Sequence, residues 1–224
     1  MVRVEGYAEI WERFKRECRL EFGGHMDPEW QEGHAVSASF VAPVEAPHLR
    51  EGLKPLRDAL RPFPFVSLHP DHFMHLTLLP LGFLAPKPED ENELSRERLE
   101  ELGERAREAL RDFPAFEMDL ANLNVFPGAA FVEARDGGML EKLRDVVCGR
   151  CGLEKPTGPF HLTLAYLQEA DGALAPEDFV AAVERYRDWP VGKVSVERVE
   201  ITLLTLGSSP YPELETFARI PLGS

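Results

Sequence analysis

Apolar residues recur along most of the chain with one of two periods, and each period predicts one type of secondary structure. Spacings of three and four residues indicate helices. Apolar residues at every second position, or in short runs rich in branched and aromatic side chains, indicate strands. The predicted helices cover residues 5–18, 49–60, 95–113, 139–147 and 176–186. The predicted strands cover residues 34–41, 65–68, 73–79, 116–125, 129–134, 160–167, 193–206 and 214–220.

Several residues mark where these elements begin, end or bend. Gly23 and Gly24 are expected to end the first helix, and the residues up to Gly33 to form a linker loop. Ser95 can cap the helix that follows it. The apolar parity shifts after Leu120, which predicts a bulge, and slips again near Glu197 inside the strand predicted over 193–206.

The order of these elements indicates an α+β fold. Strands and helices mix without the strict alternation of a doubly wound sheet, and several strands are joined by turns too short for a parallel crossover. We therefore predict two similar antiparallel-sheet lobes, with helices on the outside and a central cleft. The N-terminal helix and linker, residues 1–33, would precede a single bilobal domain over residues 34–224.

The tetrapeptide His-Leu-Thr-Leu occurs twice, at 75–78 and at 161–164, once in each half of the chain. In a strand the histidine and the threonine share one face, while the leucines are buried on the other. An imidazole can carry a proton near neutral pH and a hydroxyl can donate to a phosphoryl oxygen, so the pair suits a phosphate. For either copy alone, a half-buried structural histidine is the simpler explanation. Two copies indicate a diverged internal repeat whose strands face each other across a cleft.

Paired motifs of this kind resemble the signature of the 2H phosphoesterase superfamily, which includes the 2′-5′ RNA ligase and cyclic phosphodiesterase proteins. Residues 75–83, His-Leu-Thr-Leu-Leu-Pro-Leu-Gly-Phe, are similar to the family's first motif and the Leu-Gly turn after it. The resemblance extends from about His34 to Leu222. It implies the same bilobal fold and the opening of 2′,3′-cyclic phosphates or related 2′-5′ linked nucleotides. Some members join RNA ends in the reverse direction.

Two imidazoles and two hydroxyls in one cleft are sufficient for phosphoester hydrolysis. His75 and His161 can act as general base and general acid, each contributing about 10²–10⁴-fold. Thr77 and Thr163 would bind the non-bridging oxygens and stabilise the charge that develops on them. We therefore expect no metal and no other cofactor. The near-twofold arrangement leaves open which histidine is the base.

One departure from the family pattern bears on the substrate. Many RNA ligase-like members have an arginine two residues past the second motif, and this chain has Tyr166 there. A phenol keeps a hydrogen-bond donor and a stacking face but loses the charge, which argues against a long RNA substrate and against ligation. Lys155 could supply that charge, although a surface lysine is the simpler interpretation. Tyr166, Phe126 and Phe83 are candidates for stacking on a nucleobase, against the commoner role of core aromatics.

The charge balance also favours a small ligand. The net charge is −14, from 39 acidic and 25 basic residues, which disfavours an extended nucleic-acid partner. The same balance is compatible with a small nucleotide or a short RNA with a cyclic phosphate, bound in a local pocket. Uninterrupted apolar runs stay well below membrane-spanning length, and the charged start is no secretory signal, so we expect no membrane partner and a cytoplasmic monomer.

Two further clusters could hold a metal. Cys148 and Cys151 have zinc or redox spacing, but no second cysteine pair follows, and a helix end running into a glycine-containing turn is the simpler interpretation. His69, His72 and His75 also lie at regular spacing. Pro70 interrupts them, so the first two are expected in the turn that leads to the motif strand.

The combined prediction is a metal-independent phosphodiesterase that hydrolyses cyclic or 2′-5′ linked phosphoesters of small nucleotides or RNA ends by two-histidine catalysis. Two alternatives stay open: an RNA 2′-5′ ligase, and a non-catalytic nucleotide- or phosphate-binding module. The intact histidines and threonines of both motifs speak against the binding module, because binding alone would not need two proton-transfer groups.

Overall fold

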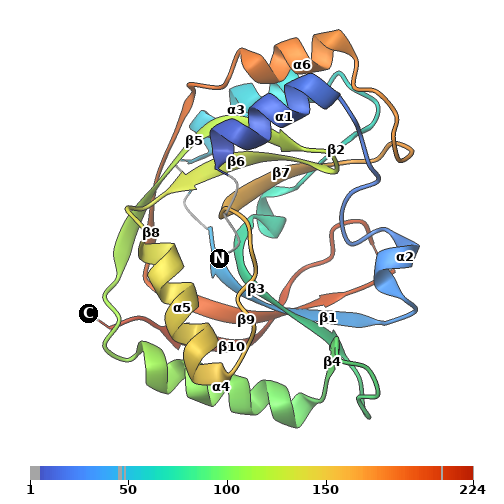
Figure 1. Ribbon diagram of the computed structural model, residues 1–224. Coiled ribbons are helices and arrows are strands. Elements are labelled where there is room, and N and C mark those ends of the chain that lie inside the picture. The colour runs from blue at the N-terminus through green and yellow to red at the C-terminus, as the bar shows by residue number, and fades with distance from the viewer. Residues whose placement is uncertain (1–5, 45–46, 48, 208, 224) are drawn as a thin grey trace.

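The computed structural model describes residues 6–44, 47, 49–207 and 209–223, and it confirms the α+β class (Figure 1). The helices are α1 (Tyr7–Glu17), α2 (Pro28–Gln31), α3 (Leu49–Leu60), α4 (Arg96–Leu110), α5 (Met139–Cys151) and α6 (Glu177–Glu184), with a 3₁₀ turn η1 at Asp71–Phe73. The strands are β1 (Val36–Pro43), β2 (Val66–Leu68), β3 (His75–Leu84), β4 (Glu93–Leu94), β5 (Phe116–Phe126), β6 (Ala129–Arg135), β7 (His161–Leu167), β8 (Pro190–Val196), β9 (Arg198–Thr205) and β10 (Glu215–Pro221).

The two predicted lobes are the two halves of one continuous, curled sheet. Within the described residues its order is β10-β9-β1-β3-β7-β6-β5-β8, with β2 beside β7 and β4 beside β3. The pairings are antiparallel apart from the short parallel contact of β3 with β4. The halves meet where the motif strands β3 and β7 pair at Leu76 and Leu162. The first half is therefore β10-β9-β1-β3 and the second half is β7-β6-β5-β8.

The helices divide between the two halves and cover the apolar side chains of each. Figure 1 shows α4 and α5 along the first half, and α1, α3 and α6 along the second. Helix α4 begins at Ser95, whose hydroxyl accepts from the Arg98 N–H at 3.2 Å, as the sequence predicted. Its Gly103 faces Ile201 and Ala218 of the sheet.

The prediction of one strand over 193–206 is wrong. The segment forms two strands, β8 and β9, which belong to opposite halves of the sheet. The change of apolar parity at Glu197 marks the point where the chain leaves β5 and begins to pair with β1 and β10. By contrast, the parity shift after Leu120 is a bulge as predicted, with Asn122 in the left-handed region (φ 61°).

The first helix ends within one residue of its predicted span, but Gly23 and Gly24 do not end it, contrary to the prediction. Helix α1 stops at Glu17, and Cys18 adopts a left-handed conformation (φ 49°) that lets its N–H donate to the Phe14 carbonyl. The segment expected as a plain linker contains the short helix α2, capped by Asp27, which accepts from the Glu29 N–H at 2.9 Å. Residues 1–5 of the predicted N-terminal segment lie outside the described residues.

Candidate active site

The four motif side chains share the inner face of the sheet, at the junction of its halves. Leu76 and Leu162 are fully buried partners of β3 and β7, and their side chains point to the outer face. The histidines and threonines on either side therefore point inward. Because the pairing is antiparallel, the histidine of each strand faces the threonine of the other: His75 lies on the side of Thr163, and Thr77 on the side of His161.

Both imidazoles are held by the same hydrogen bond. Nδ1 of His75 donates to the Phe73 carbonyl at 2.8 Å, and Nδ1 of His161 donates to the Pro159 carbonyl at 3.0 Å. A carbonyl oxygen only accepts, so the proton on each ring stays on Nδ1 and the neutral ring keeps its lone pair on Nε2. Each histidine can therefore accept or deliver a proton through Nε2.

Burial makes both histidines hard to protonate in the free protein. The pKa of His75 falls to about 4, mainly because burial penalises the imidazolium, while the bond to Phe73 acts in the opposite direction. The pKa of His161 is lowered as well, first by burial and, to a lesser extent, by the charge of Arg144. Both rings are therefore neutral near pH 7, and a bound anion would raise both pKa values.

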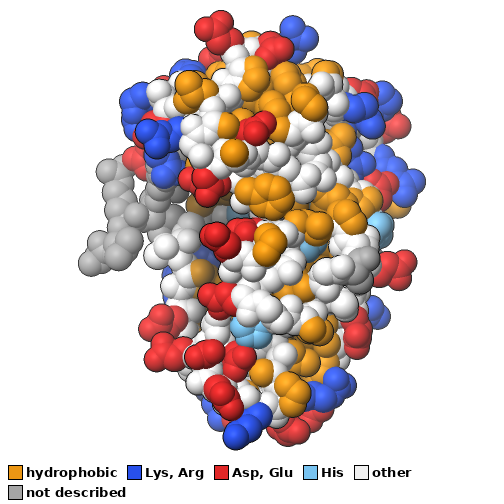
Figure 2. All heavy atoms as spheres, turned by 90° about the vertical axis from the view of Figure 1, so that its right-hand side faces the viewer, with side chains coloured by type: hydrophobic (Ala, Val, Ile, Leu, Met, Phe, Trp, Pro, Cys, Tyr) orange, Lys and Arg blue, Asp and Glu red, His pale blue; other side chains and the backbone are white. Residues whose placement is uncertain are grey.

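Two cavities reach the inner face beside the first motif. One of about 420 Å³ is lined by His75, Thr77 and Tyr166 together with residues of β1 and of the 24–30 segment. A second, of about 500 Å³, also borders His75 and includes Arg50 and Glu200. His161 and Thr163 line neither. Figure 2, which shows the face carrying α2, has hydrophobic side chains along its middle, with both acidic and basic side chains around them.

Tyr166 lies in the wall of the smaller cavity, where burial raises its pKa. Its hydroxyl is 3.4 Å from Nδ1 of His25, and its ring lies edge-on to His69 with ring centroids 4.5 Å apart. His69 and His72 lie at the end of β2 and in η1, as predicted, and His69 is buried. Tyr166 thus belongs to an aromatic cluster behind His75, and the sequence pattern gave no sign of the contribution from His25.

Phe126 and Phe83 occupy different surroundings. Phe126 stacks on Phe131 (centroids 4.3 Å apart) and lies edge-on to His161 (5.1 Å), so it supports the second histidine and lines neither cavity. Phe83 lines the smaller cavity and stacks against His34, with ring planes 7° apart. Of the stacking candidates, Phe83 and Tyr166 are those that border the cavity of His75.

The positive charge near the second motif comes from Arg144 and not from Lys155. Lys155 is paired with Glu141 and Asp145, each at 2.5 Å. Arg144 is 6% exposed, lies 3.7 Å over the Phe160 ring and donates to the Leu78 carbonyl at 3.0 Å. The sequence analysis missed it, although it falls on the buried stripe of α5, one turn from the apolar residues there.

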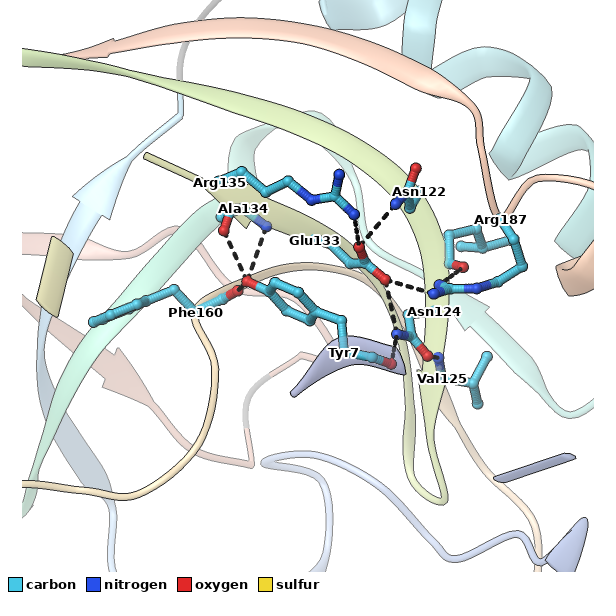
Figure 3. Close-up of polar contacts among 10 residues, drawn as sticks. Tyr7, Asn122, Asn124, Val125, Glu133, Ala134, Arg135, Phe160 and Arg187 are labelled. Carbon is cyan, nitrogen blue, oxygen red and sulfur yellow. Dashed lines mark hydrogen bonds and ion pairs between the residues drawn. The ribbon is translucent and has the colours of Figure 1, made fainter. Parts of the chain in front are cut away.

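A fully buried carboxylate, Glu133, lies beside His161 as its partner across β6 and β7 (Figure 3). Four side chains donate to it or pair with it: Asn122, Asn124, Arg135 and Arg187. The two amides and two guanidinium groups satisfy the charge, which would otherwise be costly to bury. This network makes the wall behind the second histidine rigid, and no sequence motif indicated it.

The N-terminal helix reaches the same wall through Tyr7. Its hydroxyl accepts from the Ala134 N–H at 3.2 Å and donates to the Phe160 carbonyl at 2.5 Å, with the Ala134 carbonyl 2.8 Å away (Figure 3). Glu133 and His161 pair across β6 and β7, and Ala134 and Phe160 are the residues adjacent to that pair. The Tyr7 hydroxyl bonds to both of these residues and so extends the hydrogen bonding between the two strands by one position. Tyr7 therefore fixes the peptide that precedes His161.

Cys148 and Cys151 are buried in the last turn of α5, and burial raises the pKa of both thiols. Among the described residues, no three histidine, cysteine or acidic side chains are grouped so that they could hold a metal ion. No helix in the described part of the chain is long and apolar enough to cross a membrane.

Comparison with known proteins identifies the family of the chain. The sequence profile of the 2′-5′ RNA ligase superfamily matches residues 36–205, which include both motifs. The chain belongs to this superfamily of 2H phosphoesterases, as the paired motifs led us to expect. The match begins after α2, so the segment that carries Tyr7 and His25 precedes it.

Solved structures show the same fold at low sequence identity. LigT of E. coli, in a complex with NADP+, is 17% identical, with a TM-score of 0.59 over 86% of this chain and 100% of LigT. The protein TT0787 of Thermus thermophilus is 21% identical, with a TM-score of 0.57 over 84% of this chain and 99% of that protein. A protein described as a phosphoesterase is 18% identical (TM-score 0.59, covering 84% of this chain and 99% of the other). Curated proteins gave no significant match.

Proposed function

We propose that this protein is a metal-independent phosphodiesterase that hydrolyses cyclic, 2′,3′-type, or 2′-5′ linked phosphoesters of small nucleotides or RNA ends. The observation that carries this proposal is the pair of imidazoles whose Nδ1 atoms are both fixed by a carbonyl, each beside a threonine from the partner strand. Two Nε2 atoms on the inner face of the sheet can act on one phosphoester from opposite sides, one accepting a proton and the other donating one.

In the proposed reaction a water oxygen attacks phosphorus while one Nε2 takes its proton. The bond from phosphorus to the 2′ or 3′ oxygen breaks, and the other imidazole gives its proton to that oxygen. Thr77 and Thr163 donate to the non-bridging oxygens. The anionic substrate raises the pKa of the imidazole that must start protonated, which offsets the lowering caused by burial.

The substrate class rests on charge and on the relatives. The chain carries a net charge of −14, which opposes binding of a long polyanion. Structures of LigT have been solved with NADP+, ATP and 3′-AMP, all of them nucleotides. Tyr166 in place of an arginine argues for hydrolysis over ligation. RNA 2′-5′ ligation and nucleotide binding without turnover are the alternatives, and we expect a cytoplasmic monomer.

The test is a substrate screen with purified protein after exhaustive chelation. We expect turnover of 2′,3′-cyclic mononucleotides or short cyclic-phosphate-ended RNAs, unchanged by the chelator. Activity that is lost on chelation and restored by zinc or manganese would contradict the two-histidine reaction. Tight, steeply salt-dependent binding of intact transfer RNA would contradict the small substrate, because that slope counts neutralised phosphates.

A further inference from the structure

Residues 20–34, here called the bridging segment, connect the two halves of the sheet beside the smaller cavity. In Figure 1 this segment descends from α1, over the second half, to α2 beside β1 and β4 of the first half. It lies before the region that matches the superfamily, so the family pattern assigns it no role.

The bridging segment contacts the second half through backbone hydrogen bonds as well as through the side-chain contact of His25 with Tyr166. Glu21 N–H donates to the Pro127 carbonyl at 3.0 Å and Gly23 N–H to the Leu167 carbonyl at 2.8 Å. A Cβ at Gly23 would lie 1.7 Å from the Gly128 carbonyl oxygen. Such an approach is open only to glycine, so the segment is seated tightly on the turn between β5 and β6.

Its contacts with the first half are made by side chains. His34 Nε2 lies 2.8 Å from a Glu93 carboxylate oxygen, and this hydrogen bond raises the pKa of His34. The Asn92 side-chain amide donates to Glu32 at 3.0 Å. The segment is thus anchored at both ends and forms a fixed wall between the halves.

Trp30 stands on this wall and lines the same cavity as His75 and Thr77. It is 45% exposed, unusual for so large an apolar side chain, and lies 5.2 Å from the Phe83 ring, edge-on at 64°. The cavity is also lined by three residues that carry hydroxyl groups, Ser37, Ser39 and Thr202. Two aromatic rings with a few hydroxyl groups, in a cavity of about 420 Å³, suit a ligand that is planar at one end and polar at the other.

We propose that Trp30, supported from behind by Phe83, binds the nucleobase of the substrate while its phosphoester lies at His75 and Thr77. The inference rests on the proposed function and names a specificity-determining residue for it. The bridging segment contains four acidic residues and no lysine or arginine, so a phosphate chain running past it would be repelled. The site is therefore built for a mononucleotide or the last nucleotide of a short chain.

Binding measurements without turnover test this assignment. Stacking on a base contributes about 1–3 kcal/mol, so Trp30→Ala should weaken binding of 3′-AMP roughly 5- to 150-fold. Binding of inorganic phosphate should be unchanged, because it has no base. Trp30→Phe should retain most of the affinity. In the wild type, 3′-AMP should quench tryptophan fluorescence, and this quenching should disappear in Trp30→Phe.

Phe22→Ala is the matched control. Phe22 lies on the same segment, is 41% exposed and does not line the cavity. Its removal should therefore change neither the affinity for 3′-AMP nor the affinity for inorganic phosphate. Unchanged 3′-AMP binding in Trp30→Ala, an equal loss for phosphate, or an equal loss in Phe22→Ala would overturn the assignment. Base-dependent binding through Trp30 without turnover of any phosphodiester would overturn the proposed function and leave this assignment standing.

Discussion

The two halves of the sheet carry the same tetrapeptide in different surroundings. In both, a histidine is held through Nδ1 by the carbonyl two residues before it. His75 then borders two cavities, whereas His161 borders neither and is packed against Phe126 and Phe131. The motif fixes the orientation of a proton-transfer group, and the surroundings decide what that group can reach. In the proposed reaction the two halves therefore have the same chemical role but different contacts with the rest of the substrate.

Replacing either histidine by alanine tests whether the halves share one reaction. His75→Ala and His161→Ala should each lower kcat/KM about 10²–10⁴-fold, because each removes a proton-transfer group. The double variant should be little worse than either single one, because the two act as a unit. Steady-state kinetics measure this, with melting temperatures as the control for folding. The pH–rate profile of the wild type should be bell-shaped. Near-normal activity in folded His161→Ala would mean that the second motif is structural.

Replacing the threonines compares the two phosphate contacts. Thr77→Val and Thr163→Val keep the shape of the side chain and remove one hydrogen bond to a charged phosphate, so each should lower kcat about 10- to 100-fold, less than the histidine variants. The comparison is sharper if both variants are assayed with the same 2′,3′-cyclic nucleotide. A loss at one position alone would show that one half holds the phosphate by itself.

Tyr7→Phe tests the support of the second half. The change removes the hydroxyl between Ala134 and Phe160, so His161 should lose part of its alignment. We expect kcat to fall roughly 3- to 10-fold with little change in KM, and the free energy of unfolding to fall by about 1 kcal/mol. The NMR titration of the His161 imidazole should shift, whereas that of His75 should not. Tyr186→Phe, in a ring packed against Trp189, is the control, and equal effects of both variants would argue against a positioning role.

The last prediction concerns the dependence of stability on pH. His75 has a pKa of about 4 in the folded protein and about 6.5 when unfolded, so the unfolded chain binds more protons between these values. The contribution of the neutral His75 ring to the free energy of unfolding is present in full above about pH 6.5 and is lost as the pH falls toward 4. Denaturant unfolding of His75→Gln should therefore show a weaker loss of stability over this range than the wild type. Identical pH slopes would contradict the lowered pKa.

Local patterns predicted the elements, and long-range pairing limited what else could be predicted. The helical period placed α3 and α4 closely, and the alternation around residues 75–78 and 161–164 placed the motif strands, because these signals are contained in a few neighbouring residues. The passage from β8 to β9 appeared only as a parity slip, since its meaning depends on which strands pair with each side.

The missed parts of the site share one property. Arg144, Glu133 and Tyr7 act through partners far away in the sequence, such as Leu78, Arg187 and Phe160. None belongs to a short motif. Arg144 alone left a local sign, a charged residue on the apolar stripe of a helix. The positions of the histidines follow from the sequence, whereas the groups that support them follow from the contacts.

The course of the chain through the sheet has a consequence for how the protein is made. The first half needs β1 and β3 from early in the chain, and β9 and β10 from its last part, with β9 lying between β1 and β10. The strands of the second half are all in place by Val196. During synthesis the half that carries His161 can close first, and the half that carries His75 must wait for the final strands. We therefore expect that, of the two motif histidines, His75 leaves the ribosome first and is the last to reach its finished surroundings.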